Sequence, residues 1–125
     1  MGKSFYTNGS SYTLSNATTR YHMFGNSTML LLTATEIAGK TFVNQNCTVE
    51  KLKVNVTSNT RTAGTAQVLV RVGSTDSACY VDIPFGATGI FDSTGTASIT
   101  AGDLVSYKYT YGTGGTGAIT YKYVT

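Results

Sequence analysis

Apolar and polar residues alternate along most of the chain from Lys51 to the end. In the stretch 51–57 the apolar residues Leu52, Val54 and Val56 occupy every second position, with Lys, Asn and Thr between them. A period of two places alternate side chains on one face of a β-strand. The same pattern recurs, and it predicts strands over 51–57, 67–72, 79–83, 90–91, 96–100, 104–111 and 118–124.

The alternation also predicts which side chains face a core. The inward residues are expected to be Leu52, Val54, Val56, Val68, Val70, Val72, Cys79, Val81, Ile83, Ala97 and Ile99. Leu69 breaks the polar pattern of the opposite face, which indicates that the outer surface is covered there. Pro84 is predicted to end its strand, because proline cannot donate a ladder hydrogen bond.

The first half of the chain has a weaker pattern. Phe5–Tyr6, Tyr12–Leu14, Tyr21–Phe24 and Met29–Thr33 are each compatible with a strand, and Leu30–Ala38 is the one segment that could form a short helix. Short strands that recur every 8–12 residues with turn residues between them are typical of a β-sandwich or barrel. We therefore predict an all-β fold, in one domain over 1–125.

The composition supports many short strands and few helices. The chain has 23 Thr, 11 Ser and 14 Gly, only 12% charged residues and a net charge of +3. Its basic residues are scattered singly, so the pattern of a nucleic-acid-binding protein is absent. The longest apolar run, Met29–Leu32, is far too short to span a membrane, and the N-terminus lacks the apolar segment of a signal peptide. We expect synthesis in a cytoplasm without export.

Catalytic patterns are absent from the sequence. His22 is the only histidine, no Ser lies in a nucleophile-elbow motif, and the six acidic residues are isolated. No spacing of His, Cys or acidic residues matches a zinc or calcium motif, so no metal and no cofactor is predicted. Cys47 and Cys79, which are 32 residues apart without a CxxC motif, are expected to be buried free thiols.

Tyrosine is the most distinctive residue type. Tyr107, Tyr109 and Tyr111 share one face of a predicted strand, and Tyr121 and Tyr123 share one face of the next, with a Gly-rich hairpin loop between them. Three interpretations remain open at this stage. These residues line the core, form a subunit interface, or present a platform on which sugars stack.

The back half of the chain, about Thr48 to Thr125, resembles a class of small phage structural proteins. The residues that carry the resemblance are Val49–Val56, Gln67–Gly73, Val81–Gly89 and Ala101–Tyr107. The turn Gly102–Asp103, which leads into a long strand followed by a last strand, also resembles the jelly rolls of tumour-necrosis-factor-like and complement-head-like proteins. Those proteins assemble as homotrimers.

The resemblance implies a single antiparallel β-sandwich of the jelly-roll type and a non-enzymatic virion protein made in the host cytoplasm. It implies a capsid decoration protein that binds itself, a trimer being favoured, and a viral coat or tail protein. The alternative is a carbohydrate-binding or host-recognition module of a tail or fibre. Residues 1–16 are expected to form an extended arm, and the predicted partner-binding residues are Phe5, Tyr6, Tyr12, Tyr107, Tyr109, Tyr121 and Tyr123.

Overall fold

The computed structural model describes residues 12–14, 19–22 and 41–124. These residues form antiparallel β-sheets and contain no helix. The strands are β1 (Tyr12–Leu14), β2 (Arg20–His22), β3 (Thr41–Phe42), β4 (Cys47–Val49), β5 (Lys53–Asn59), β6 (Thr65–Val72), β7 (Thr75–Pro84), β8 (Gly89–Asp92), β9 (Ala97–Ile99), β10 (Leu104–Thr110) and β11 (Ile119–Val124). The predicted all-β class is confirmed.

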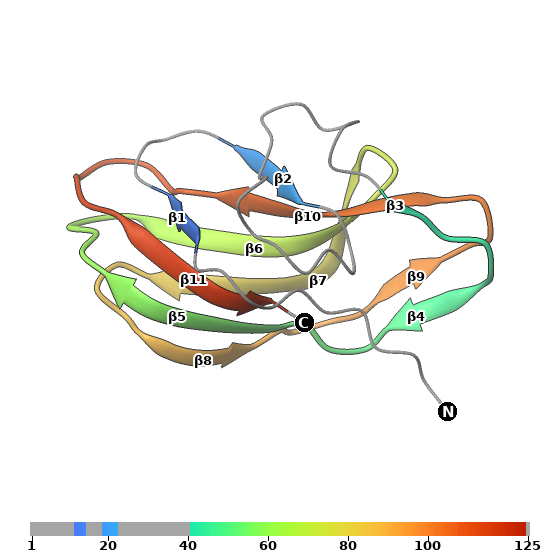
Figure 1. The fold of residues 1–125 in the computed structure, drawn as a ribbon, viewed down its shortest axis with the longest axis horizontal. Coiled ribbons are helices and arrows are strands. Elements are labelled where there is room, and N and C mark those ends of the chain that lie inside the picture. Colours follow the sequence, from blue (N-terminus) through green and yellow to red (C-terminus); the bar gives the residue numbers. More distant parts are fainter. Residues whose placement is uncertain (1–11, 15–18, 23–40, 125) are drawn as a thin grey trace.

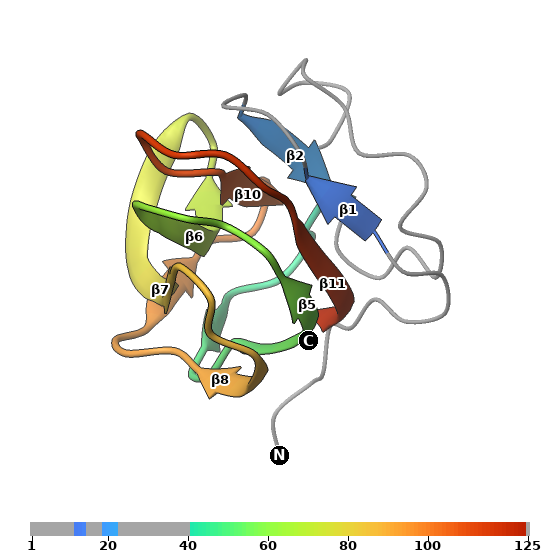
Figure 2. The ribbon, with the colours of Figure 1, turned by 90° about the vertical axis from the view of Figure 1, so that its left-hand side faces the viewer.

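Two sheets form the layers of a β-sandwich (Figures 1 and 2). One sheet has the order β1-β11-β5-β8, and the other has the order β2-β10-β6-β7, with β3 also paired to β10. The strands β4 and β9 form a separate two-stranded sheet. The β1 and β2 ends of the two sheets therefore lie toward one side of the sandwich, and β7 and β8 lie toward the other (Figure 2).

The strand pairs are nested around the turn between β6 and β7. From this turn outward, β6 pairs with β7, β5 with β8, β4 with β9, β3 and β2 with β10, and β1 with β11. The central turn needs only Gly73 and Ser74 between the paired residues Val72 and Thr75, and Gly73 has φ of +61°. Such a two-residue turn with Gly first fits the twist of a β-hairpin.

The core lies between the two sheets and is formed by the alternating residues of their inner faces. Leu52, Val54, Val56, Val68, Val70, Cys79, Val81, Ile83, Ala97 and Ile99 are all buried, as the sequence predicts. Val72 is only partly buried and packs against this core. Leu69, on the opposite face of β6, is 3% exposed, which confirms that the outer surface is covered at this position.

The predicted hairpin between the two Tyr-rich strands is wrong. β10 and β11 belong to opposite sheets, because the loop between them carries the chain across the sandwich instead of turning it back beside β10. This loop contains Gly112, Gly114, Gly115 and Gly117, all with positive φ. At Gly117 a Cβ would lie 2.1 Å from the carbonyl oxygen of Thr60, so the close approach of the two backbones requires glycine there.

Of the predicted arm over 1–16, the structure describes only residues 12–14. Tyr12–Leu14 form β1, which pairs with Ile119–Tyr121 of β11 at the edge of a sheet. Residues 1–11 and 15–16 lie outside the described residues, as do the candidate strands Phe5–Tyr6 and Met29–Thr33 and the candidate helix Leu30–Ala38. Of the candidate strand Tyr21–Phe24, Tyr21 and His22 lie in β2.

Candidate functional site

Three of the predicted partner-binding tyrosines lie inside the sandwich. Tyr107, Tyr109 and Tyr121 are at most 1% exposed, and the rings of Tyr109 and Tyr121 meet edge to face across the two sheets with centroids 5.3 Å apart. The prediction that these side chains contact a partner or a sugar is therefore corrected, and they belong to the core. Burial also raises the pKa of Tyr107 far above its ordinary value, and the neighbouring Cys79 contributes to this shift.

The other four predicted contact residues are not brought together in a described surface. Phe5 and Tyr6 lie outside the described residues. Tyr12 is the backbone partner of Tyr121 in β1, and Tyr123 lies opposite Asn55 in β11.

Arg61 is an anchor residue that the sequence analysis missed. It is 4% exposed, and its guanidinium carbon lies 3.5 Å from the centroid of the Tyr111 ring. Its two terminal nitrogens donate hydrogen bonds to the carbonyl oxygens of Gly114 at 3.1 Å and Thr116 at 3.4 Å. A single basic residue in a Thr-rich loop gives no sequence signal for such a role. Arg61 thus fixes the crossing loop after Tyr111 to the loop after β5.

Hydrogen bonds continue between these two loops beyond the ends of the strands. Thr60 N donates to Ala118 O at 2.8 Å, and Ala118 N donates to the hydroxyl of Thr60 at 2.9 Å. The same reciprocal arrangement joins Thr62 and Thr116, with bonds of 3.0 Å and 2.8 Å. Threonine hydroxyls that accept backbone N–H groups satisfy donors that no strand partner reaches. Hydrogen bonds between the two loops therefore hold this end of the sandwich together.

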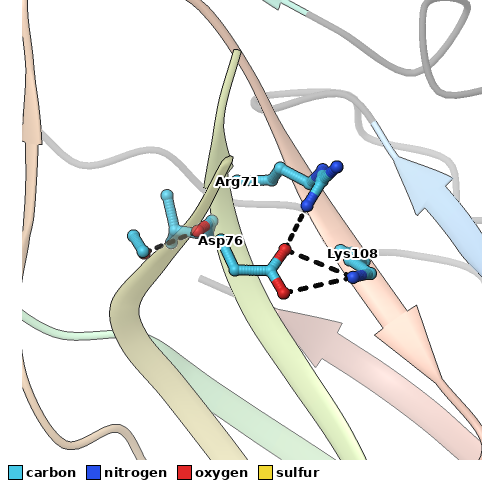
Figure 3. A network of polar contacts seen from close by, with 5 residues as sticks. Arg71, Asp76 and Lys108 are labelled. Atoms are coloured by element: carbon cyan, nitrogen blue, oxygen red, sulfur yellow. Dashed lines mark hydrogen bonds and ion pairs between the residues drawn. The ribbon is translucent and has the colours of Figure 1, made fainter. Parts of the chain in front are cut away.

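A small charge cluster lies on the outer face of the sheet that contains β6, β7 and β10 (Figure 3). Asp76 accepts a hydrogen bond from Arg71, and both of its oxygens lie 3.2 Å from the ammonium nitrogen of Lys108. Partial burial by itself raises the pKa of Asp76, but the bonds and charges of the two basic residues outweigh this effect and lower it. The cluster links β6, β7 and β10, and the carboxylate of Asp76 is paired with the two basic side chains of Arg71 and Lys108.

The cysteines are free, as predicted, but only one of them is fully buried. Cys79 is 0% exposed, and its thiol lies 3.6 Å from the hydroxyl of Ser93. Burial raises the pKa of the Cys79 thiol, although its hydrogen bonding with Ser93 and with the backbone of Leu52 partly opposes the shift. Cys47 is half-buried at the edge of the core, so the prediction of full burial is wrong for this residue.

Four large apolar side chains remain on the surface of the described residues. Phe42 is 62% exposed and Leu104 is 37% exposed, and the two are direct register partners in β3 and β10. Directly opposite residues of an antiparallel pair have Cβ atoms about 5 Å apart on one face. Ile90, in β8, is 67% exposed, and Phe85, on the connection that precedes β8, is 56% exposed. These residues are the candidate contact surfaces.

The described part of the chain holds no group of three or more His, Cys, Asp or Glu residues that could share a metal ion. Within the same residues, no helix has the length and apolarity needed to cross a membrane.

Comparison with known proteins identifies no relative of this chain. No protein-family model, no curated protein and no solved structure matches it.

Proposed function

We propose that this chain is a non-enzymatic virion structural protein, a capsid decoration protein that acts through protein–protein contacts as a homo-oligomer. The resemblance of its back half to small phage structural proteins supports this role, and the resemblance to tumour-necrosis-factor-like and complement-head-like jelly rolls favours a trimer. The proposed partner is a viral coat or tail protein.

The strand order supports the jelly-roll form of the sandwich. The eight principal strands are β1, β2, β5, β6, β7, β8, β10 and β11. Along the chain they alternate between the two sheets at every step except the turn from β6 to β7. A long antiparallel hairpin with nested pairs, rolled into two four-stranded sheets, has this order, and jelly rolls are common in capsid proteins.

The observation that carries the proposal is the exposed pair of Phe42 and Leu104. Two large apolar side chains directly opposite each other on adjacent strands form a contact point that water solvates poorly. Val43, which follows Phe42, is buried and bonded through its backbone to Gly102 and Asp103. The pair is therefore held on a fixed backbone, and a preorganised surface loses little conformational entropy when it binds.

The proposal is tested by sedimentation of the purified protein with assembled capsids and, separately, with isolated coat subunits. We expect far tighter binding to the capsid lattice, because an oligomer that bridges neighbouring coat proteins gains from multivalency. Phe42→Lys should weaken capsid binding at least tenfold, since it places a charge in the apolar contact. Asn44→Lys, which changes an exposed polar residue two positions away, should leave binding intact.

Two results would contradict the proposal. Capsid binding by Phe42→Lys as tight as that of Asn44→Lys and of the wild type would show that Phe42 takes no part in the contact. Binding to glycans on an array, together with no binding to capsids, would favour the sugar-binding role instead.

A further inference from the structure

β8 forms the edge of its sheet, and half of its backbone groups point away from the sheet. Ser93 N donates to Leu52 O at 2.8 Å, and Leu52 N donates to the Ser93 hydroxyl at 2.8 Å, so the backbone groups of these two residues point toward each other just beyond the β5–β8 ladder. Hydrogen-bonded pairs alternate with non-hydrogen-bonded pairs in an antiparallel ladder. Phe91 and Gly89 therefore bond to β5, whereas the N–H and C=O groups of Ile90 and Asp92 point outward.

The free section of this edge is short and has a defined end. Thr94 is the next residue after Ile90 and Asp92 whose backbone groups point to the same side. Its N–H donates to Tyr80 O of β7 at 3.1 Å, and Tyr80 N donates to Thr94 O at 3.3 Å. The outward backbone groups of β8 are thus those of Ile90 and Asp92, and Ile90 has the most exposed large apolar side chain among the described residues.

This edge has only some of the devices that usually prevent strands from pairing between molecules: it is short, and its one charged residue, Asp92, lies at its end. Edge strands are commonly protected by Lys, by Pro or by a bulge. The neighbouring edge strand β7 ends in Pro84, but β8 contains no proline and no lysine, and its Asp92 lies within 4 Å of the ammonium groups of Lys51 and Lys53. The β5–β8 register runs without a shift from Lys53–Asp92 to Val56–Gly89, so no bulge interrupts it.

We propose that β8 pairs antiparallel with β8 of a second copy of this chain about a twofold axis, with Ile90 opposite Ile90 of the second copy. This inference rests on the proposed function, because it assigns the surface of the proposed self-association. In a hydrogen-bonded pair across such an axis, the N–H of each Ile90 meets the C=O of the other. The edge is therefore complementary to itself, and the two sheets join into one continuous sheet.

The side chains select this register over its alternatives. Hydrogen-bonded pairing across the axis is restricted to residues with outward groups, so Ile90 can face Ile90 or Asp92, and Asp92 can face Asp92. Pairing of Asp92 with Asp92 places two carboxylates opposite each other, and pairing of Ile90 with Asp92 places a carboxylate against an apolar side chain. Both arrangements are unfavourable. Pairing of Ile90 with itself joins two apolar side chains and sets Asp92 opposite the exposed Thr88.

A charge-swap experiment tests the contact by light scattering at tens of micromolar. The wild-type mass should be an even multiple of the chain mass, either a dimer or, if the favoured trimer forms through another surface, a hexamer. Ile90→Lys and Ile90→Glu should each halve that mass, because each places like charges opposite each other. An equimolar mixture of the two variants should restore it, since Lys then faces Glu across the axis.

Controls separate this inference from misfolding and from the proposed function. Thr57→Lys adds the same charge to the exposed outer face of the neighbouring strand β5 and should leave the mass unchanged. Each variant should keep the wild-type circular dichroism spectrum. A wild-type monomer, or a mass that neither Ile90 variant changes, overturns the β8 pairing. A wild-type trimer whose mass neither Ile90 substitution changes would also overturn the β8 pairing, but it would leave the proposed homo-oligomeric role intact. Capsid binding is measured in a separate experiment and does not depend on either result.

Discussion

Replacement of Arg61 by Ala tests whether a buried cation holds the two loops at one end of the sandwich. The substitution removes the guanidinium that lies 3.5 Å from the Tyr111 ring and donates to the carbonyl oxygens of Gly114 and Thr116. The fold should survive, because a domain of this size has about 5–15 kcal/mol of stability. The loops should nevertheless lose their shared anchor.

The expected loss follows from the surroundings of the guanidinium. A cation over an aromatic ring contributes about 2 kcal/mol when it is removed from water. A hydrogen bond from a charged donor adds about 1.5 kcal/mol at the low end of its range. That low end applies here because Gly114 is exposed to water and Thr116 O already accepts the N–H of Thr62. Because each of these two oxygens has another donor available, we count the two bonds together as one, and we therefore expect a loss of about 3.5 kcal/mol in the free energy of unfolding.

Urea unfolding, followed by circular dichroism, measures this loss. With a slope of about 2 kcal/mol per molar, the midpoint should fall by roughly 1.8 M. Lys53→Ala is the matched control: the Lys53 side chain is 53% exposed and lies 3.8 Å from Asp92, so its removal should change the stability by less than about 1 kcal/mol. A change below about 1 kcal/mol for Arg61→Ala would refute the anchoring role.

Three further predictions concern other parts of the sandwich. Gly117→Ala should lower the free energy of unfolding, measured in urea, by more than about 2 kcal/mol, because of the clash with Thr60 and the positive φ. Gly86→Ala, where φ is also positive but the space is open, should lower it by only about 1 kcal/mol. Asp76→Asn should reduce the stability by up to about 1 kcal/mol at neutral pH. Because the folded-state pKa of Asp76 is lowered, this difference should persist above the ordinary carboxyl pKa and vanish as the pH falls through the lowered value. A thiol reagent should modify one cysteine, Cys47, in the native protein, and Cys79 only after denaturation; equal rates for both would contradict the burial of Cys79.

The sequence predicts the strands of the second half well, because one buried face imposes a period of two. Val54, Val68, Val81 and Ile99 all lie on the face that the alternation assigns to the core. The same pattern cannot tell which sheet a strand joins, since it records only which side is buried. This is why the strands that carry Tyr109 and Tyr121 were predicted to be neighbours, although they lie in opposite sheets.

The exposed apolar residues of the candidate contact surfaces could not be identified from the sequence pattern. Exposed apolar residues such as Phe42 and Ile90 look like core residues in a sequence, because both lie in apolar strand segments. Their exposure follows from the positions of β3 and β8 at sheet edges, which long-range pairing determines. The burial of Arg61 likewise depends on a loop more than 50 positions away in the chain.

The nested pairing of the strands has a consequence for the order in which the newly made protein can fold. The hairpin of β6 and β7 can close as soon as it leaves the ribosome, but each earlier strand must wait for a partner that is translated later. Thr13 and Thr120 are 107 positions apart, which corresponds to about 5 to 20 seconds of synthesis. Because β11 lies between β1 and β5, both of these strands lack that neighbour until Ile119–Val124 are translated. A nascent chain of this protein must therefore keep the strands β1 to β5 from aggregating until the strands that pair with them, β8 to β11, have been made.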